Sequence, residues 1–217
     1  MVQYVFNILL TRIMPYQLRE QEKNIFTLDI GCYFLKLNFL EKRIDGAKMI
    51  SEVCKASTQM TFQASIDAKE NSSDKLHTNH FIKKVVEKLK HEKVLLQMFS
   101  KERAHQQLVE RGEEVLKLLI QQDAMTSEDL ELVWSATKLD ETTKLELYKL
   151  FNELSSILKI KEIVFIVDYL SQVPLAKIIS EQVDLVYEIG KRARSGESEY
   201  GQKVIDYMWR LALPSIE

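Results

Sequence analysis

The stretch Val204-Ile205-Asp206-Tyr207-Met208-Trp209-Arg210-Leu211-Ala212 is the most informative about the fold class of this chain. It closes a succession of amphipathic helical segments that short polar breaks separate. Such a succession is typical of helical-repeat scaffolds, in which stacked helices work by presenting surface.

Composition favours helices and excludes some function classes. The chain has 217 residues, of which 46% are hydrophobic and 29% charged, so it can bury a sizeable core in one or two domains. It has only 6 glycines and 3 prolines, which favours long helices because both residues interrupt regular structure. The formal net charge of -2 gives no electrostatic attraction to nucleic acid or anionic lipid. We therefore predict an all-α fold, a HEAT- or armadillo-like helical-repeat solenoid, without demonstrating a fixed sequence period.

Cysteine usage and hydropathy predict a cytoplasmic protein. Cys32 and Cys54 each lie in an apolar helical pattern, which predicts buried reduced thiols and no disulfide. The apolar run Ile163–Val167 is far too short to span a membrane, since a span needs about 20 apolar residues. Residues 1–10 are apolar but lack the basic region and cleavage site of a signal peptide. We expect the chain to begin inside a helix, as a fragment of a larger protein would.

The pattern along the chain predicts three parts: an N-terminal helical block over residues 1–60, a flexible loop over 61–79 and a helical-repeat block over 80–217. The loop is predicted because Thr61–Asn79 has few apolar residues and includes the turn formers Asn71-Ser72-Ser73-Asp74. Helices are expected at Met1–Met14, Tyr16–Leu37, Leu40–Met60, Phe81–Phe99, Glu102–Gln122, Leu130–Thr137, Glu141–Leu158, Lys161–Ser171, Ser180–Arg192 and Tyr200–Leu213.

Local signals refine these helices. Gly46 lies inside a predicted helix, where we expect close packing by a neighbouring helix to require it. Thr126-Ser127-Glu128-Asp129 is a helix start, and Asp140 is expected to cap the helix that follows it. By propensity alone Ile163–Val167 could be a buried strand, but we predict helix because every neighbouring segment is helical.

No group of residues has the spacing of an active site, so we assign no catalytic, cofactor-binding or metal-binding residue and expect no cofactor. Gly31-Cys32-Tyr33 superficially resembles a thiol-protease nucleophile, but Cys32 falls in mid-helix, away from anything that lowers a thiol pKa. His77, His80 and His91 have no cysteine pair to complete a zinc site and are expected on the solvated surface.

A lysine-rich stretch and four aromatic residues are expected to have structural roles. Glutamates at helix-neighbour spacing interrupt the Lys83–Lys93 stretch, which favours a solvated helix face over a nucleic-acid surface. Trp134, Trp209, Tyr148 and Tyr207 are expected in the core, and any of them that is exposed becomes a candidate partner anchor. Two alternatives stay open: a cysteine hydrolase using Cys32, and a nucleic-acid adaptor using Lys83–Lys93.

Several segments resemble the helical-repeat region of the very large fat-facets-type ubiquitin carboxyl-terminal hydrolases. Leu-Glu-x-Arg-x-x-Gly recurs in that region, and Leu40-Glu41-Lys42-Arg43-Ile44-Asp45-Gly46 has this pattern. The likeness covers most of the chain, with a gap around residues 61–79. Upstream, the likeness runs from Leu28-Asp29 through this pattern to Gly46. The other segments that carry it are Leu132-Val133-Trp134-Ser135-Ala136, Tyr148-Lys149-Leu150 with Glu153-Leu154, and Lys203–Ala212.

The resemblance implies a non-catalytic segment N-terminal to the peptidase domain of a long deubiquitinase. The catalytic domain of that family has a Gly-Asn-Thr-Cys-Tyr box, whereas Gly31-Cys32-Tyr33 lacks the Asn-Thr, so no catalytic residue carries over and this segment is not expected to cleave ubiquitin. The expected function is a scaffold for protein–protein interaction or substrate recruitment. Its expected partners are proteins, ubiquitinated substrates among the candidates, and neither nucleic acid nor a membrane. Whether the parent chain has an active peptidase is left open.

Overall fold

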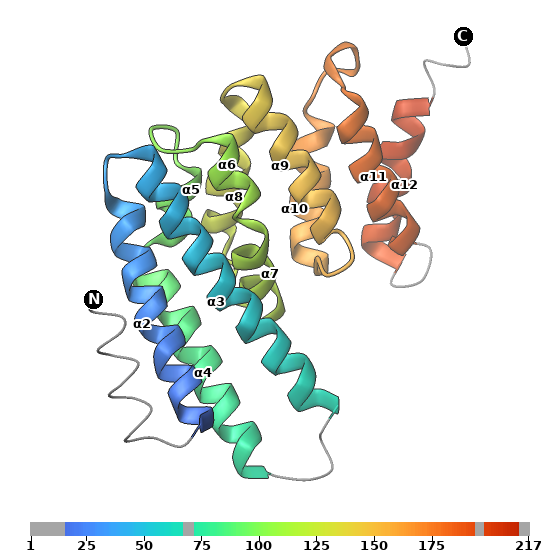
Figure 1. The fold of residues 1–217 in the computed structure, drawn as a ribbon. Helices are drawn as coiled ribbons and strands as arrows, with labels where there is room; N and C mark the ends of the chain where they lie inside the picture. Colours follow the sequence, from blue (N-terminus) through green and yellow to red (C-terminus); the bar gives the residue numbers. More distant parts are fainter. Residues whose placement is uncertain (1–15, 67–71, 194–197, 213–217) are drawn as a thin grey trace. The chain divides into compact units, whose positions relative to one another are not determined.

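A computed structural model describes residues 16–66, 72–193 and 198–212, and every regular element in these ranges is a helix. The chain forms two compact units, Met1–Met98 and Phe99–Glu217, each of which is described by itself (Figure 1). Within the described ranges, no helix combines the length and the apolar character that crossing a membrane requires.

The first unit is built on long helices that lie side by side in Figure 1: α2 (Tyr16–Lys36), α3 (Leu40–Ile66) and α4 (Ser72–His91). The short α5 (Val94–Phe99) follows, and the boundary between the units falls before its last residue. Two glycines bring α2 and α3 together. A Cβ on Gly46 would lie 2.6 Å from the backbone oxygen of Gly31 and 2.7 Å from the backbone nitrogen of Leu35. This confirms the prediction that close helix packing requires Gly46.

Ion pairs tie α4 to α2 at the edge of this unit. The Lys88 ammonium lies 2.7 Å from Asp29 of α2, and Lys84 lies 3.7 Å from Glu22 of the same helix. Glu92 pairs with Lys36, whose hydrogen bond is the main cause that lowers the pKa of Glu92 to about 2. The lysines of α4 therefore help to position the helices of this unit.

The second unit is a succession of shorter helices. Its later members, α9 to α12, follow one another as a row in Figure 1. The elements are α6 (Gln106–Glu110), α7 (Glu113–Gln121), α8 (Ser127–Ser135), η1 (Ala136–Lys138), α9 (Glu141–Leu154), α10 (Ile160–Ser171), η2 (Leu175–Lys177), α11 (Ser180–Ala193) and α12 (Ser198–Ala212).

Successive helix pairs stack in the second unit. Helix α11 packs on α9 and on α12, and α12 also packs on α10. The side-chain amide of Gln182 on α11 donates a buried 2.6 Å hydrogen bond to the Tyr148 hydroxyl on α9. The Tyr207 hydroxyl on α12 donates to the Leu170 carbonyl oxygen on α10 at 3.1 Å. Pairwise stacking of this kind is that of a helical-repeat solenoid, as predicted.

An aromatic cluster joins α8, α9 and α10, with Trp134, Tyr148 and Phe151 buried and Phe165 and Tyr169 half-buried. The Trp134 ring on α8 contacts Tyr148 and Phe151 of α9, with centroids 5.9 and 5.4 Å apart. It also contacts Phe165 and Tyr169 of α10, at 6.4 and 5.7 Å. Tilted and edge-on ring packing of this kind adds stabilisation beyond the buried area.

Both predicted helix starts are present. Thr126 caps α8 in a capping box, since its hydroxyl accepts from the Asp129 N–H and the Asp129 carboxylate accepts from the Thr126 N–H. Asp140 caps α9 by accepting from the Thr143 N–H at 2.9 Å. Hydrogen bonds from Thr142 and Thr143 hold the pKa of the Asp140 carboxyl well below its usual range.

Helices occupy most of the segment that was predicted as a loop. Helix α3 continues to Ile66 and α4 begins at Ser72, so residues 61–66 and 72–79 are helical, while residues 67–71 lie outside the described residues. Hydroxyl groups near the end of α3 are satisfied inside the helix, because they bond back to carbonyls one turn earlier: Ser57 donates to Val53, Thr58 to Cys54 and Thr61 to Ser57.

Other boundaries also differ from the sequence pattern. In the sequence, the boundary between the two units lies between Met98 and Phe99, inside the predicted block 80–217. The predicted Phe81–Phe99 helix is divided into α4 and α5, and Lys93 has a left-handed φ of 52° at the break. The predicted Glu102–Gln122 helix is divided into α6 and α7 near Gly112, where a Cβ would lie 2.5 Å from the Phe99 ring. The predicted Met1–Met14 helix lies outside the described residues.

Candidate protein-interaction surface

Helices α11 and α12 each present a pair of apolar residues to solvent. On α11 these are Val183 and Tyr187, and on α12 they are Ile205 and Trp209. The largest two are well exposed, with 56% of Tyr187 and 60% of Trp209 accessible. Residues four apart lie on one face of a helix, so each pair forms a short ridge. We call these four residues the distal face.

On α12 the distal face points away from α10. Tyr207 is buried against α10, and Arg210 donates a 2.6 Å hydrogen bond to the Ser171 carbonyl oxygen at the end of that helix. Ile205 and Trp209 are each two residues from Tyr207, which places them about 200° round the helix. They therefore lie opposite the contact with α10.

On α11 the distal face lies beside α12. A Cβ on Gly190 would lie 2.8 Å from the Met208 sulfur of α12, so this side of α11 faces α12. Val183 is seven residues from Gly190 and therefore within about 20° of the same direction. Val183 and Tyr187 are also two residues from the fully buried Leu185, about 200° round the helix. The two ridges therefore flank the seam between α11 and α12.

The core prediction for Trp209 is wrong, whereas Trp134, Tyr148 and Tyr207 are buried as predicted. Helix α12 is apolar on two sides, since Val204 and Tyr207 face inward while Ile205 and Trp209 face outward. A helical wheel of the sequence shows both stripes, but only the contact with α10 determines which of them is buried.

Charged groups border the distal face. Asp184 and Asp206 are exposed, and Asp206 accepts a 2.7 Å hydrogen bond from the Gln202 amide. The Lys191 ammonium lies 4.5 Å from the Tyr187 ring centroid and donates a 2.6 Å hydrogen bond to Glu188, which raises the pKa of Lys191. Lys191 thus makes a cation–π contact with the Tyr187 ring.

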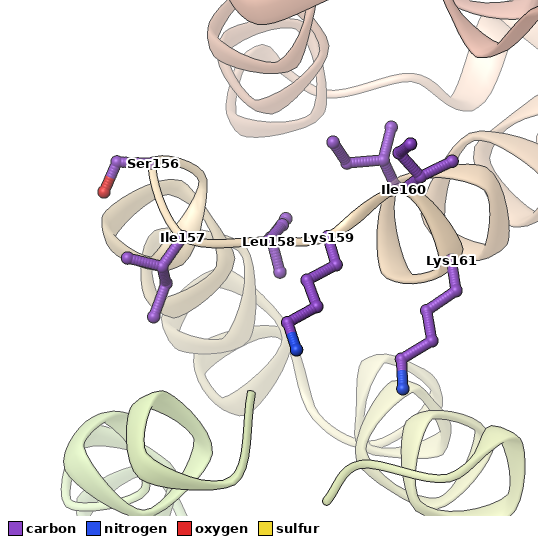
Figure 2. A pocket seen from close by; sticks show the side chains of 7 residues that line it. Ser156, Ile157, Leu158, Lys159, Ile160 and Lys161 are labelled. Atoms are coloured by element: carbon purple, nitrogen blue, oxygen red, sulfur yellow. The ribbon is translucent and has the colours of Figure 1, made fainter. Parts of the chain in front are cut away.

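A shallow hollow of about 540 Å³ lies where α9 passes into α10. Figure 2 shows that the Lys159 and Lys161 side chains point the same way, while Ile160 points away from them. Both ammonium groups bind Asp123, at 3.2 and 2.7 Å, and their hydrogen bonds lower the pKa of that carboxyl. The lining residues are Ser156, Ile157, Leu158, Lys159, Ile160, Lys161 and Ile163. The lysines here bind Asp123 of the chain itself. We therefore take the distal face, and not this hollow, as the candidate interaction surface.

Cys32 is buried in α2, and burial is the main cause that raises the pKa of its thiol to about 12. A nucleophilic cysteine needs the opposite shift. Cys54 is also buried, and both thiols are free, as predicted.

The remaining candidate residues lie on α4. His77, His80 and His91 are exposed, and within the described part of the chain no three or more His, Cys, Asp or Glu residues form a group that could hold a metal ion. Lys83 pairs with Glu87 at 3.9 Å, and Lys88 pairs with both Asp29 and Glu92. These lysines therefore pair with carboxylates of the first unit itself.

Comparison with known proteins agrees with this architecture. The family model described as the UBP24/USP9X/USP9Y ARM repeat matches residues 21–215 of the chain. Searches of curated proteins and of solved structures gave no match.

Proposed function

Since the chain belongs to the UBP24/USP9X/USP9Y ARM-repeat family, we propose that it serves a large ubiquitin hydrolase as a non-catalytic scaffold segment that binds other proteins. The observation that carries this proposal is the distal face, on which two exposed aromatic residues lie on adjacent stacked helices. Tryptophan and tyrosine dominate the affinity of protein interfaces, because each contributes a large apolar area at low entropic cost. Recruitment of ubiquitinated substrates in the cytoplasm is one form that this function would take.

Site-directed photocrosslinking tests the proposal. A benzoylphenylalanine replacing Trp209 should crosslink to other proteins in cells, and the crosslinks should weaken when Tyr187 is changed to Ala. The same probe replacing Phe39 is the matched control, because Phe39 is also an exposed aromatic residue but lies in the first unit. Equal crosslinking from the two positions would contradict the proposal.

The competing enzymatic function depends on Cys32. Its burial and its raised pKa both oppose thiolate formation, so a ubiquitin-based electrophilic probe should not label the chain. Labelling that disappears in Cys32→Ala would replace the scaffold proposal with a cysteine hydrolase.

The nucleic-acid alternative depends on Lys83–Lys93. Lys83 and Lys88 of this stretch already pair with carboxylates of the first unit, which leaves less charge for phosphate. Binding of a DNA duplex that weakens steeply with salt would support this alternative instead.

A further inference from the structure

We draw no further inference here: the strongest candidate, the half-buried ring pair of Phe165 and Tyr169 on α10, which packs against the buried Trp134 of α8, carries nothing because nothing in the described part of the chain shows what covers it.

Discussion

At the residue scale, the two tryptophans have opposite environments. Trp134 is buried among the rings of α9 and α10, whereas Trp209 is 60% exposed. Trp134→Ala should lower the free energy of unfolding by about 3 to 5 kcal/mol, because it empties a packed core. Trp209→Ala should change it by less than about 0.5 kcal/mol. Urea denaturation followed by circular dichroism measures both, and equal losses would mean that Trp209 is buried in solution.

Cys32 gives a second prediction at this scale. Burial raises the pKa of its thiol from 9.0 to about 12, so the folded protein keeps the proton over a pH range in which the unfolded chain loses it. The unfolded state then binds fewer protons, and stability should fall as pH rises from 9.0 toward 12. Thermal unfolding of the parent chain and of Cys32→Ala, compared across this pH range, isolates the contribution of the thiol. If the stabilities of the two proteins change with pH in parallel, the thiol makes no such contribution.

At the element scale, Gly46 tests the contact between α2 and α3. Helix propensity alone predicts that Gly46→Ala stabilises the chain by about 1 kcal/mol. The added Cβ would lie 2.6 Å from the Gly31 backbone oxygen, which no side-chain rotation relieves. The variant should therefore lose about 1 to 3 kcal/mol in chemical denaturation. Gly190→Ala is the matched control and should be tolerated better, because the end of the flexible Met208 side chain can move aside.

The cap of α9 gives another prediction for a helix. Asp140→Ala should cost about 1 kcal/mol, because the Thr143 N–H loses its acceptor. Hydrogen bonds lower the pKa of Asp140 below its ordinary 3.8, so its contribution to stability is present above that pH and is lost as the pH falls below it. Thermal melts should converge at low pH for the two proteins, and a constant difference down to pH 2 would contradict this assignment.

At the scale of the whole molecule, unfolding of the two units can be followed with different spectroscopic signals. Trp134 and Trp209 both lie in the unit Phe99–Glu217, whereas circular dichroism reports helices of both units. Because each unit encloses its own core, Gly46→Ala should lower the unfolding midpoint seen by circular dichroism and leave the fluorescence midpoint unchanged. If the two midpoints move together, the units unfold as one cooperative structure.

Local chemistry made much of the fold predictable from sequence. The starts of α8 and α9 follow from Thr126 and Asp140, because a cap depends only on residues of its own turn. The helix at Ile163–Val167 followed from its helical neighbours, against its strand propensity. Residues 61–66 and 72–79 are helical although their polar composition suits a turn equally well, and the Thr61 hydroxyl donates to the Ser57 carbonyl oxygen one turn earlier.

The sequence by itself determined that this chain forms amphipathic helices of a repeat scaffold, because helical periodicity and capping are properties of neighbouring residues. Only the tertiary structure decided which of the two apolar stripes of α12 became core. Tyr207 is buried with its hydroxyl bonded to the Leu170 carbonyl oxygen of α10, and the same contact turns Trp209 outward. The candidate site thus depends on a packing choice between helices that are far apart in sequence, and periodicity within one helix carries no information about that choice.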